Sequence, residues 1–380
     1  MTRLAPRPSP HALRDASDAG PLLPRLDPIE QLPILILYPH SRCNCRCLMC
    51  DIWRVTTKEE IAPEAIARWL PDWLRLGVQR VVLSGGEALM NTRLWELCAA
   101  LHDAGMGITL LSTGLLLRRH ADNVVRYCDD VVVSLDGPAD IHNAIRRIPN
   151  AFGKLAEGVA AVRAADDARA VRVSGRCVVQ RANHGQLCAT VRAAHEIGLE
   201  HISFLAVDVT SEAFNRPGGW ETERASDVAL AAEDLPRLLE ELGRLETEHS
   251  ADFASGFIGE SPLKLRRRLY QYFAALLGAA EFHPIDCNAP WVSSVIETDG
   301  TVRPCFFQPP LGNIHESGSL AAVLNSEAAR AWRRGLDTQR DEICRKCVCS
   351  LSLRDTVTRS RFLDQLADRA GSTSSGEQQG

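Results

Sequence analysis

Eight of the thirteen cysteines in this chain stand in two tight sets, one near each end of the sequence. In the first set, Cys43, Cys47 and Cys50 have the spacing C-x3-C-x2-C. One loop with this spacing can present three thiolates to one face of a cubic iron–sulfur cluster and leave the fourth iron without a protein ligand. That iron is free to bind a substrate or cosubstrate, so this loop is the first candidate for chemistry.

Two other uses of these cysteines have to be weighed. A disulfide framework fits poorly, because the chain is 380 residues long and its first twenty residues contain no apolar stretch that could serve as a signal peptide. A reducing, cytoplasmic location is therefore expected. Zinc is the stronger alternative, since thiolates bind zinc as well as iron–sulfur clusters, and Cys45 could complete a set of four. The spacing alone leaves both metals open.

A second motif follows one strand–helix unit after the cysteine loop. The apolar run 81–83 leads into Ser84, Gly85, Gly86 and Glu87, so a strand ends at two glycines that let a ligand approach the backbone closely. The backbone groups and the Glu87 carboxylate could then receive an ammonium group. In isolation, Gly-Gly-Glu is most simply a turn.

The cysteine loop and the Gly-Gly-Glu motif together resemble the signature of the radical S-adenosylmethionine (SAM) enzymes. This resemblance implies SAM as cosubstrate and a [4Fe-4S] cluster ligated by Cys43, Cys47 and Cys50. It implies further that the methionine amino group is bound by Gly85, Gly86 and Glu87. The position before the third cysteine is often aromatic in this superfamily, and Met49 stands there instead. This difference affects adenine packing but not cluster ligation.

Six stretches have the pattern of strands and alternate with amphipathic helical stretches. We expect strands at 33–38, 78–83, 107–112, 130–135, 171–179 and 201–207. We expect helices at 63–76, 94–104, 115–127, 152–165 and 184–197. Six strand–helix units in series predict an α/β fold with a parallel sheet, curled as a partial (β/α)6 TIM-like barrel. The motifs all follow strand ends, which is where parallel barrels carry their chemistry.

The fourth expected strand ends in another motif, Ser-Leu-Asp-Gly at 134–137. It is similar to a segment of radical SAM enzymes with an iron–sulfur C-terminal extension, in which the serine and a later arginine approach the SAM ribose or carboxylate. The resemblance assigns these roles to Ser134 and to Arg146, although Arg147 is adjacent. Asp136 is most simply a turn former and His142 a helix-cap or surface histidine, with a catalytic role for either as the alternative.

The second cysteine set contains Cys287, Cys305, Cys344 and Cys347. Between the first two, residues 293–307 predict a β-hairpin with an Asp-Gly turn at 299–300. The arrangement looks like the twitch domain, the shortened SPASM extension, and implies a small α+β domain with one auxiliary [4Fe-4S] cluster on these four cysteines. Cys349 could replace Cys347 as a ligand. A second auxiliary cluster would need further cysteines after this pair, and Cys349 alone is not enough. A zinc ribbon on the same thiolates is the alternative.

The resemblance implies reductive cleavage of SAM to methionine and a 5′-deoxyadenosyl radical that abstracts a hydrogen atom from the substrate. Four thiolates leave no open iron on the auxiliary cluster, so we expect it to take an electron, which makes the net reaction an oxidation by dehydrogenation or bond formation. The alternatives are a ribosomal-peptide maturase of the same superfamily and a non-catalytic metal-binding protein. About thirty residues before the first strand are too few for a peptide-recognition domain, which favours a small-molecule substrate over a peptide.

The remaining expectations concern organisation and partners. The expected parts are a disordered arm at 1–32, the barrel at 33–210, a helical linker or insertion at 211–284, the auxiliary-cluster domain at 285–355, and a helix with a disordered tail at 356–380. The basic segment 264–273 is a solvated face or a docking face for a flavodoxin- or ferredoxin-type reductant. The net charge of −5 gives no reason to expect nucleic acid, and no apolar stretch is long enough to span a membrane.

Overall fold

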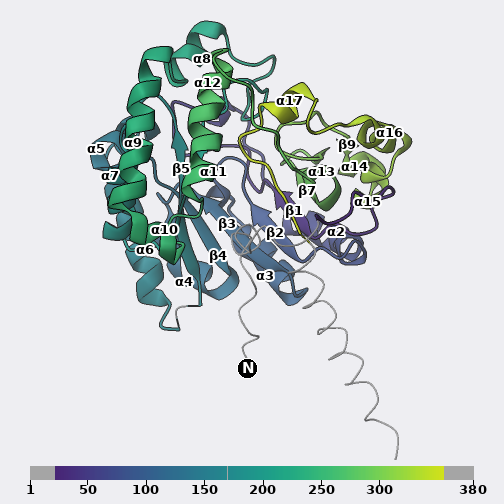
Figure 1. Cartoon of the computed structure of the whole chain (residues 1–380). Coiled ribbons are helices and arrows are strands. Elements are labelled where there is room, and N and C mark those ends of the chain that lie inside the picture. Colours follow the sequence, from purple (N-terminus) through teal and green to yellow (C-terminus); the bar gives the residue numbers. More distant parts are fainter. Residues whose placement is uncertain (1–21, 169, 355–380) are drawn as a thin grey trace, which may run out of the picture.

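The computed structural model describes residues 22–168 and 170–354 of the chain. They form a mixed α/β fold on one nine-stranded sheet, with strand order β6-β5-β4-β3-β2-β1-β7-β8-β9 (Figure 1). Six strands are those expected from the sequence: β1 (Ile34–Leu37), β2 (Arg80–Leu83), β3 (Gly107–Ser112), β4 (Asp130–Ser134), β5 (Arg172–Val179) and β6 (Ile202–Ala206). Each of them pairs in parallel with the next. Because β6 lies at one edge, the sheet is not closed, and the predicted partial barrel is confirmed.

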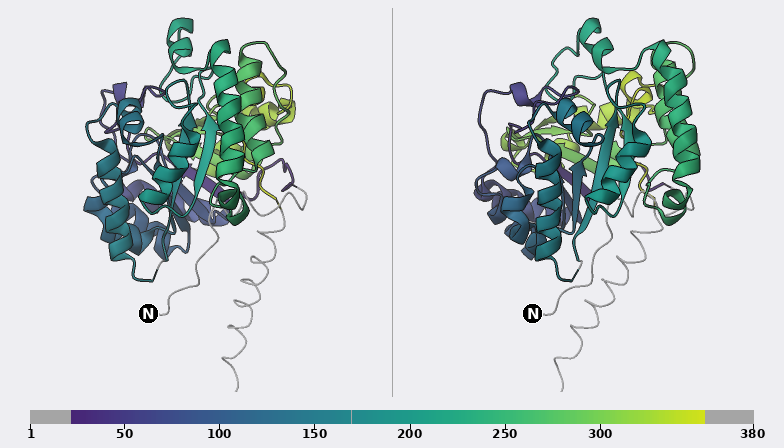
Figure 2. Two further views of the ribbon diagram at one scale, coloured as in Figure 1. Left: turned by 60° about the vertical axis from the view of Figure 1, so that its left-hand side comes forward. Right: turned by 90° about the vertical axis from the view of Figure 1, so that its left-hand side faces the viewer.

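Helices cover the outer face of the six parallel strands (Figure 2). They are α2 (Pro63–Arg75), α3 (Leu94–Asp103), α4 (Leu117–Tyr127), α5 (Ala139–Arg146), α6 (Ala151–Ala165) and α7 (Leu187–Glu196). The apolar spacing of α2 explains its packing, since Ile66, Trp69 and Trp73 recur at helical intervals and are buried. Helix α5 was not expected from the sequence, because its eight residues form only about two turns, too few to show such a period.

A helical segment follows β6 and packs beside α7. It contains α8 (Thr222–Val228), α9 (Leu235–Glu248), α10 (Ser250–Ser255), α11 (Pro262–Leu265), the π-helical turn η4 (Arg266–Gln271) and α12 (Tyr272–Leu276). Helix α9 contacts both α7 and η4, so the segment is attached to the barrel. Across the described part of the chain, no helix combines the length and the apolar character that crossing a membrane would need.

The C-terminal region extends the barrel sheet. Strand β7 (Ser293–Ile296) pairs in parallel with β1, and β8 (Thr301–Arg303) and β9 (Gly312–Asn313) continue antiparallel. This confirms the predicted hairpin, whose turn holds Gly300 at φ +85°. The helices of this region are α13 (Ala289–Val292), α14 (Ile314–Ser317), α15 (Leu320–Leu324), α16 (Glu327–Gly335) and α17 (Glu342–Arg345). Strand β1 therefore lies between the barrel and this region.

The segment 22–32 belongs to the arm that the sequence suggested to be disordered, yet it lies against the C-terminal region. The Leu23 amide donates a hydrogen bond to the Leu353 carbonyl (2.8 Å), and Ile29 and Leu32 are buried. The prolines of this segment suggested disorder, but apolar residues between them supply enough surface to bury. Residues 1–21 and the tail from 355 onward lie outside the described residues.

Packing of this segment can be tested by a matched pair of truncations. Leu32 is fully buried whereas Leu26 is 46% exposed. We expect Leu32→Ala to lower the free energy of unfolding by about 2–5 kcal/mol because it leaves a cavity. Leu26→Ala should change it by less than about 0.5 kcal/mol. Urea unfolding of both variants measures this. If Leu32→Ala changes the free energy of unfolding as little as Leu26→Ala does, the segment does not stabilise the fold.

Candidate active site

The loop after β1 brings the first cysteine set together. The thiols of Cys43 and Cys47 hydrogen-bond the Cys45 thiol and, together with burial, hold the pKa of Cys45 far above its usual range. The sulfur of Cys50 accepts a hydrogen bond from the Ile52 amide (3.4 Å). Burial, followed by the charge of Cys47, raises the pKa of Cys50 to about 12. A cation is therefore needed to hold all the thiols of this loop as thiolates, and a soft metal cluster fits such a donor set.

Cys47 has the most acidic thiol of this loop among those with a shifted pKa. The hydrogen bond with Cys45 and the positive charge of Arg146 lower the pKa of Cys47 to about 6, although burial acts in the opposite direction. The Arg146 Nη1 atom donates to the Cys47 sulfur at 3.4 Å. Cys47 is thus prepared as a thiolate, the form in which cysteine binds metals.

Helix α5 holds the same loop through its backbone. The amides of Arg46 and Leu48 donate to the carbonyl oxygens of Arg146 (3.2 Å) and Ile145 (3.0 Å) at the end of α5. The last carbonyl groups of a helix lack partners inside the helix, so they are available to a neighbouring loop. The unexpected helix α5 therefore supplies both the backbone support and the guanidinium next to Cys47.

The Gly85-Gly86 pair lies directly against the cysteine loop. A Cβ atom on Gly86 would lie 2.1 Å from the Arg42 carbonyl oxygen, and the Glu87 amide donates to that same oxygen (3.0 Å). Gly85 has φ +89°, and a Cβ atom there would lie 2.7 Å from the Tyr38 ring. Only glycine permits this approach, so the two motifs recognised in the sequence share one surface.

The Glu87 carboxylate points into the protein. It is fully buried and accepts hydrogen bonds from Ser112 Oγ (3.0 Å), the Thr113 amide (2.7 Å) and the Leu89 amide (3.2 Å). Burial raises its pKa, which these hydrogen bonds partly offset. Glu87 thus ties the glycine motif to the end of β3, while Ser84, Gly85 and Gly86 remain partly exposed beside the cysteine loop.

The Ser-Leu-Asp-Gly motif leads to a buried ion pair. The Asp136 carboxylate accepts a hydrogen bond from Arg146 Nε (2.7 Å) and another from the Val178 amide (3.2 Å). Arg146 is consequently fixed between Asp136 and the Cys47 sulfur. Arg147, which the sequence did not separate from Arg146, is exposed and ends α5 in the left-handed conformation. Ser134 is half-buried at the end of β4, and Gly137 follows Asp136.

His142 lies inside the protein, so its interpretation as a surface histidine is wrong. Its Nδ1 atom accepts the Asp136 amide hydrogen (3.2 Å), and its Nε2 atom has no hydrogen-bond partner among the described residues. Burial, followed by the charge of Arg146, lowers the pKa of His142 to about 4. The ring is therefore neutral near pH 7 and supports the turn that carries Asp136.

One support of the cysteine loop escaped the sequence analysis. Asp51 follows the last cysteine of the loop, and its buried carboxylate accepts hydrogen bonds from Trp220 Nε1 (2.5 Å) and Arg224 (2.8 Å). The Asp51 amide in turn donates to the Phe214 carbonyl (3.2 Å). The stretch 214–224 thus closes on the loop. The sequence signal that could have indicated this contact is the presence of Trp220 and Arg224 within an otherwise polar insertion.

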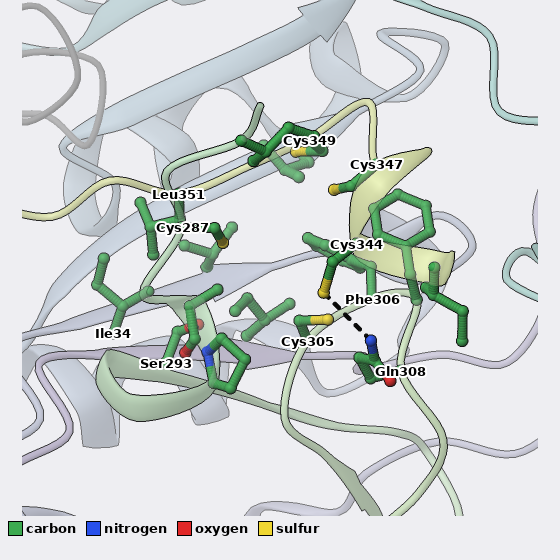
Figure 3. A pocket seen from close by; sticks show the side chains of 18 of the residues that line it. Ile34, Cys287, Ser293, Cys305, Phe306, Gln308, Cys344, Cys347, Cys349 and Leu351 are labelled. Carbon is green, nitrogen blue, oxygen red and sulfur yellow. Dashed lines mark hydrogen bonds between the residues drawn. The ribbon is translucent and has the colours of Figure 1, made fainter. Parts of the chain in front are cut away.

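The second cysteine set lines one cavity of about 130 Å³ (Figure 3). The cysteines that line it are Cys287, Cys305, Cys344, Cys347 and Cys349. Its described lining includes no carboxylate and no imidazole, and β1 and Phe306 contribute apolar walls. Burial raises the pKa of Cys305 to about 11 and that of Cys344 to about 12, while Gln308 Nε2 donates to the Cys344 sulfur (3.3 Å). This all-sulfur, largely apolar set fits an iron–sulfur cluster.

Comparison with known families gives the class of protein. Residues 37–192 match the radical SAM superfamily, and residues 287–348 match the SPASM iron–sulfur cluster-binding domain. The chain belongs to the radical SAM superfamily and carries a SPASM domain. These domains imply [4Fe-4S] clusters and SAM, in agreement with the two thiol sets of the structure.

Individual relatives agree with this assignment. The chain is similar to the AdoMet-dependent heme synthase of Methanosarcina barkeri, with 25% identity over 77% of this chain and 82% of that protein. It is also similar to the PqqA peptide cyclase of Ruegeria pomeroyi, with 27% identity over 80% and 77% of the two chains. Its fold resembles the structure of anSMEcpe with bound AdoMet, at a TM-score of 0.59 and 18% identity over 90% and 99%.

The neutral buried His142 predicts a pH dependence of stability. The unfolded state has the usual histidine pKa near 6.5, above the folded value of about 4, so it binds more protons as the pH falls. When the pH falls from 7.5 to 5.5, this histidine should lower the free energy of unfolding by roughly 1 kcal/mol. The variant His142→Leu should lack this decrease, because it has no imidazole to protonate. The matched control is Phe152→Leu, which removes the ring packed 6.2 Å from His142 but no titratable group. Urea unfolding at both pH values measures the difference, and an unchanged slope for His142→Leu contradicts the prediction.

Proposed function

We propose that this protein is a radical SAM oxidoreductase that abstracts a hydrogen atom from its substrate and completes a net oxidation. When bound, the [4Fe-4S] cluster supplies the electron that cleaves SAM to methionine and a 5′-deoxyadenosyl radical. The observation that carries the proposal is the shared position of both thiol sets on β1. One set follows the end of this strand, and the other lines a cavity that Ile34 and Ile36 of the same strand also line.

The proposed roles of individual residues follow from their contacts. Cys43, Cys47 and Cys50 would hold the first cluster, and the partly exposed backbone at Gly85 and Gly86 would bind the methionine part of SAM. Ser134, at the end of β4, would contact the SAM ribose or carboxylate. Arg146 is a positioning residue, because it donates to Cys47 and is itself held by Asp136. We assign no proton transfer to Asp136 or His142. Asp136 is paired with Arg146, and His142 is buried with a lowered pKa, which makes it a weak base.

The oxidative part of the proposal rests on the second cavity. Its ligands would be Cys287, Cys305, Cys344 and Cys347. Side chains from the inner face of the barrel, including Val82, Thr109 and Val132, line this same cavity. A substrate in the barrel would therefore lie near an electron acceptor, which supports dehydrogenation or oxidative bond formation rather than a redox-neutral reaction.

The substrate class has two candidates. The similarity to a heme synthase favours a small molecule, whereas the similarity to a PqqA peptide cyclase favours a peptide. A flavodoxin- or ferredoxin-type protein would serve as reductant in either case.

The two proposed cluster sites can be separated by metal analysis. Anaerobically reconstituted protein should contain about eight irons per chain, and Cys43→Ala, Cys47→Ala, Cys50→Ala combined should retain about four. Cys98→Ala is the matched control, since Cys98 is buried in α3 outside both sets and its loss should leave the iron content unchanged. If the triple variant contains zinc instead of the expected four irons, the C-terminal set is a zinc site. The proposed oxidative step would then have no electron acceptor.

SAM cleavage gives an independent readout. With dithionite and SAM, the reconstituted protein should form 5′-deoxyadenosine, and the triple cysteine variant should form none because it lacks the first cluster. Chromatography with mass detection measures the product. A protein with full iron content that forms no 5′-deoxyadenosine would instead be the non-catalytic metal-binding protein considered from the sequence.

A further inference from the structure

A second, larger cavity lies outside the proposed SAM site. It has a volume of about 350 Å³, within the range of small-molecule sites. One wall is formed by the helical segment α11, η4 and α12, and the opposite wall by the chain from Arg345 to Arg354. The start of β6 closes one side through His201 and Ser203. We call it the basic cavity, because five of the residues that line it are lysine or arginine: Lys264, Arg267, Arg268, Arg345 and Arg354.

Three of these cations have no acidic partner among the described residues. Lys264 and Arg267 form no ion pair with any residue in the described part of the chain, and Arg268 donates to the Ser350 hydroxyl (3.1 Å). Among the described residues, two carboxylates line the same cavity, those of Glu260 and Asp286. The cavity therefore has an excess of positive charge in a chain whose net charge is −5. Such a local excess attracts anions.

The neighbouring histidine reports the same positive field. His283 lines the cavity, and its pKa lies below the usual range because of burial and then because of the charges of Arg267 and Arg268. A bound anion would relieve this repulsion. The cavity and its charges are thus two agreeing observations.

The backbone at the basic wall is unusual. Residues Arg266–Gln271 form a π-helical turn, a rare conformation that is frequent at functional sites. This turn carries Arg267 and Arg268, which line the cavity, whereas Arg266 pairs with Glu246 outside it (3.0 Å). The run of three arginines is therefore divided between an ordinary surface ion pair and the cavity, so only part of it is the solvated face expected from the sequence.

We propose that the basic cavity binds a small molecule with two or more carboxylate or phosphate groups. Arg267 and Lys264 would contact the anionic groups, since arginine binds such groups through two parallel hydrogen bonds and lysine acts as a point charge. A small molecule is favoured over a docked reductant because these cations line a hollow of molecular size rather than a flat face. Cys347 and Ile285 line both this cavity and the thiol-lined one, so the ligand would lie next to the proposed auxiliary site. The proposal does not depend on the SAM chemistry.

Calorimetric titration of the reconstituted protein tests this. The probes are tricarballylate for carboxylates, pyrophosphate (called phosphate below) for phosphates, and tetraglutamate for an acidic peptide. Saturable binding of tricarballylate or phosphate is expected, and Lys264→Ala combined with Arg267→Ala should weaken it by about tenfold or more, as loss of charge-assisted hydrogen bonds requires. Arg340→Ala is the matched control, because Arg340 is 89% exposed and paired with Asp337. It should bind as the wild type does.

Each outcome decides the proposal. Preferential binding of tricarballylate or of phosphate supports it and identifies the anionic group. Arg267→Lys should bind more weakly than the wild type but better than Arg267→Ala, because lysine keeps the charge and loses the two parallel hydrogen bonds. No saturable binding of either small anion overturns it, as does equal binding by the double variant and the wild type. Binding of tetraglutamate alone overturns the small-molecule proposal in favour of a peptide or protein partner. The visible spectrum of the clusters, recorded for every variant, verifies that each one is folded and loaded.

Discussion

The pairing of β1 with strands on both of its sides is the interaction on which both thiol sites depend. Residues 34–37 pair with β2 along one edge of the strand and with β7 along the other. Each pairing is parallel and in register over four residues. The cysteine loop leaves this strand at its end, and its side chains Ile34 and Ile36 reach the second thiol-lined cavity. The strand is therefore a rigid common wall, and movement of one site relative to the other would break the central ladder of the sheet.

Electrostatics adds a second constraint. Thiolates are unfavourable in a buried environment unless a positive charge lies near them. Arg146 supplies such a charge to Cys47, and Asp136 holds the guanidinium in place. Asp136 and Arg146 are both buried, so each neutralises the charge of the other. Loss of either partner would leave an unpaired buried charge. The same segment therefore supports the fold and stabilises the thiolate of Cys47, a proposed metal ligand.

The basic cavity extends this pattern of charge away from the barrel. Its cations come from α11 and the adjoining π-helical turn η4, and from the segment 345–354, which lies far away in the sequence. The two cavities share Cys347 and Ile285, so a charged ligand in one lies close to the metal-binding groups of the other. The proposed ligand and the proposed auxiliary cluster would therefore be neighbours in space.

The sequence by itself determined the features that depend on local pattern: six strands with their helices, the Asp-Gly hairpin, and two cysteine sets, because apolar periodicity and metal-ligand spacing are properties of short segments. It did not reveal α5, whose eight residues form only about two turns, too few to show a clear period. It also did not decide between Arg146 and Arg147, or place Glu87 and His142 in the interior. Only the tertiary structure decided these, because burial and hydrogen bonding depend on which distant strands, loops and helices surround a side chain. The basic cavity also depends on the tertiary structure, since its charges meet only when α11 and η4 pack near the segment 345–354.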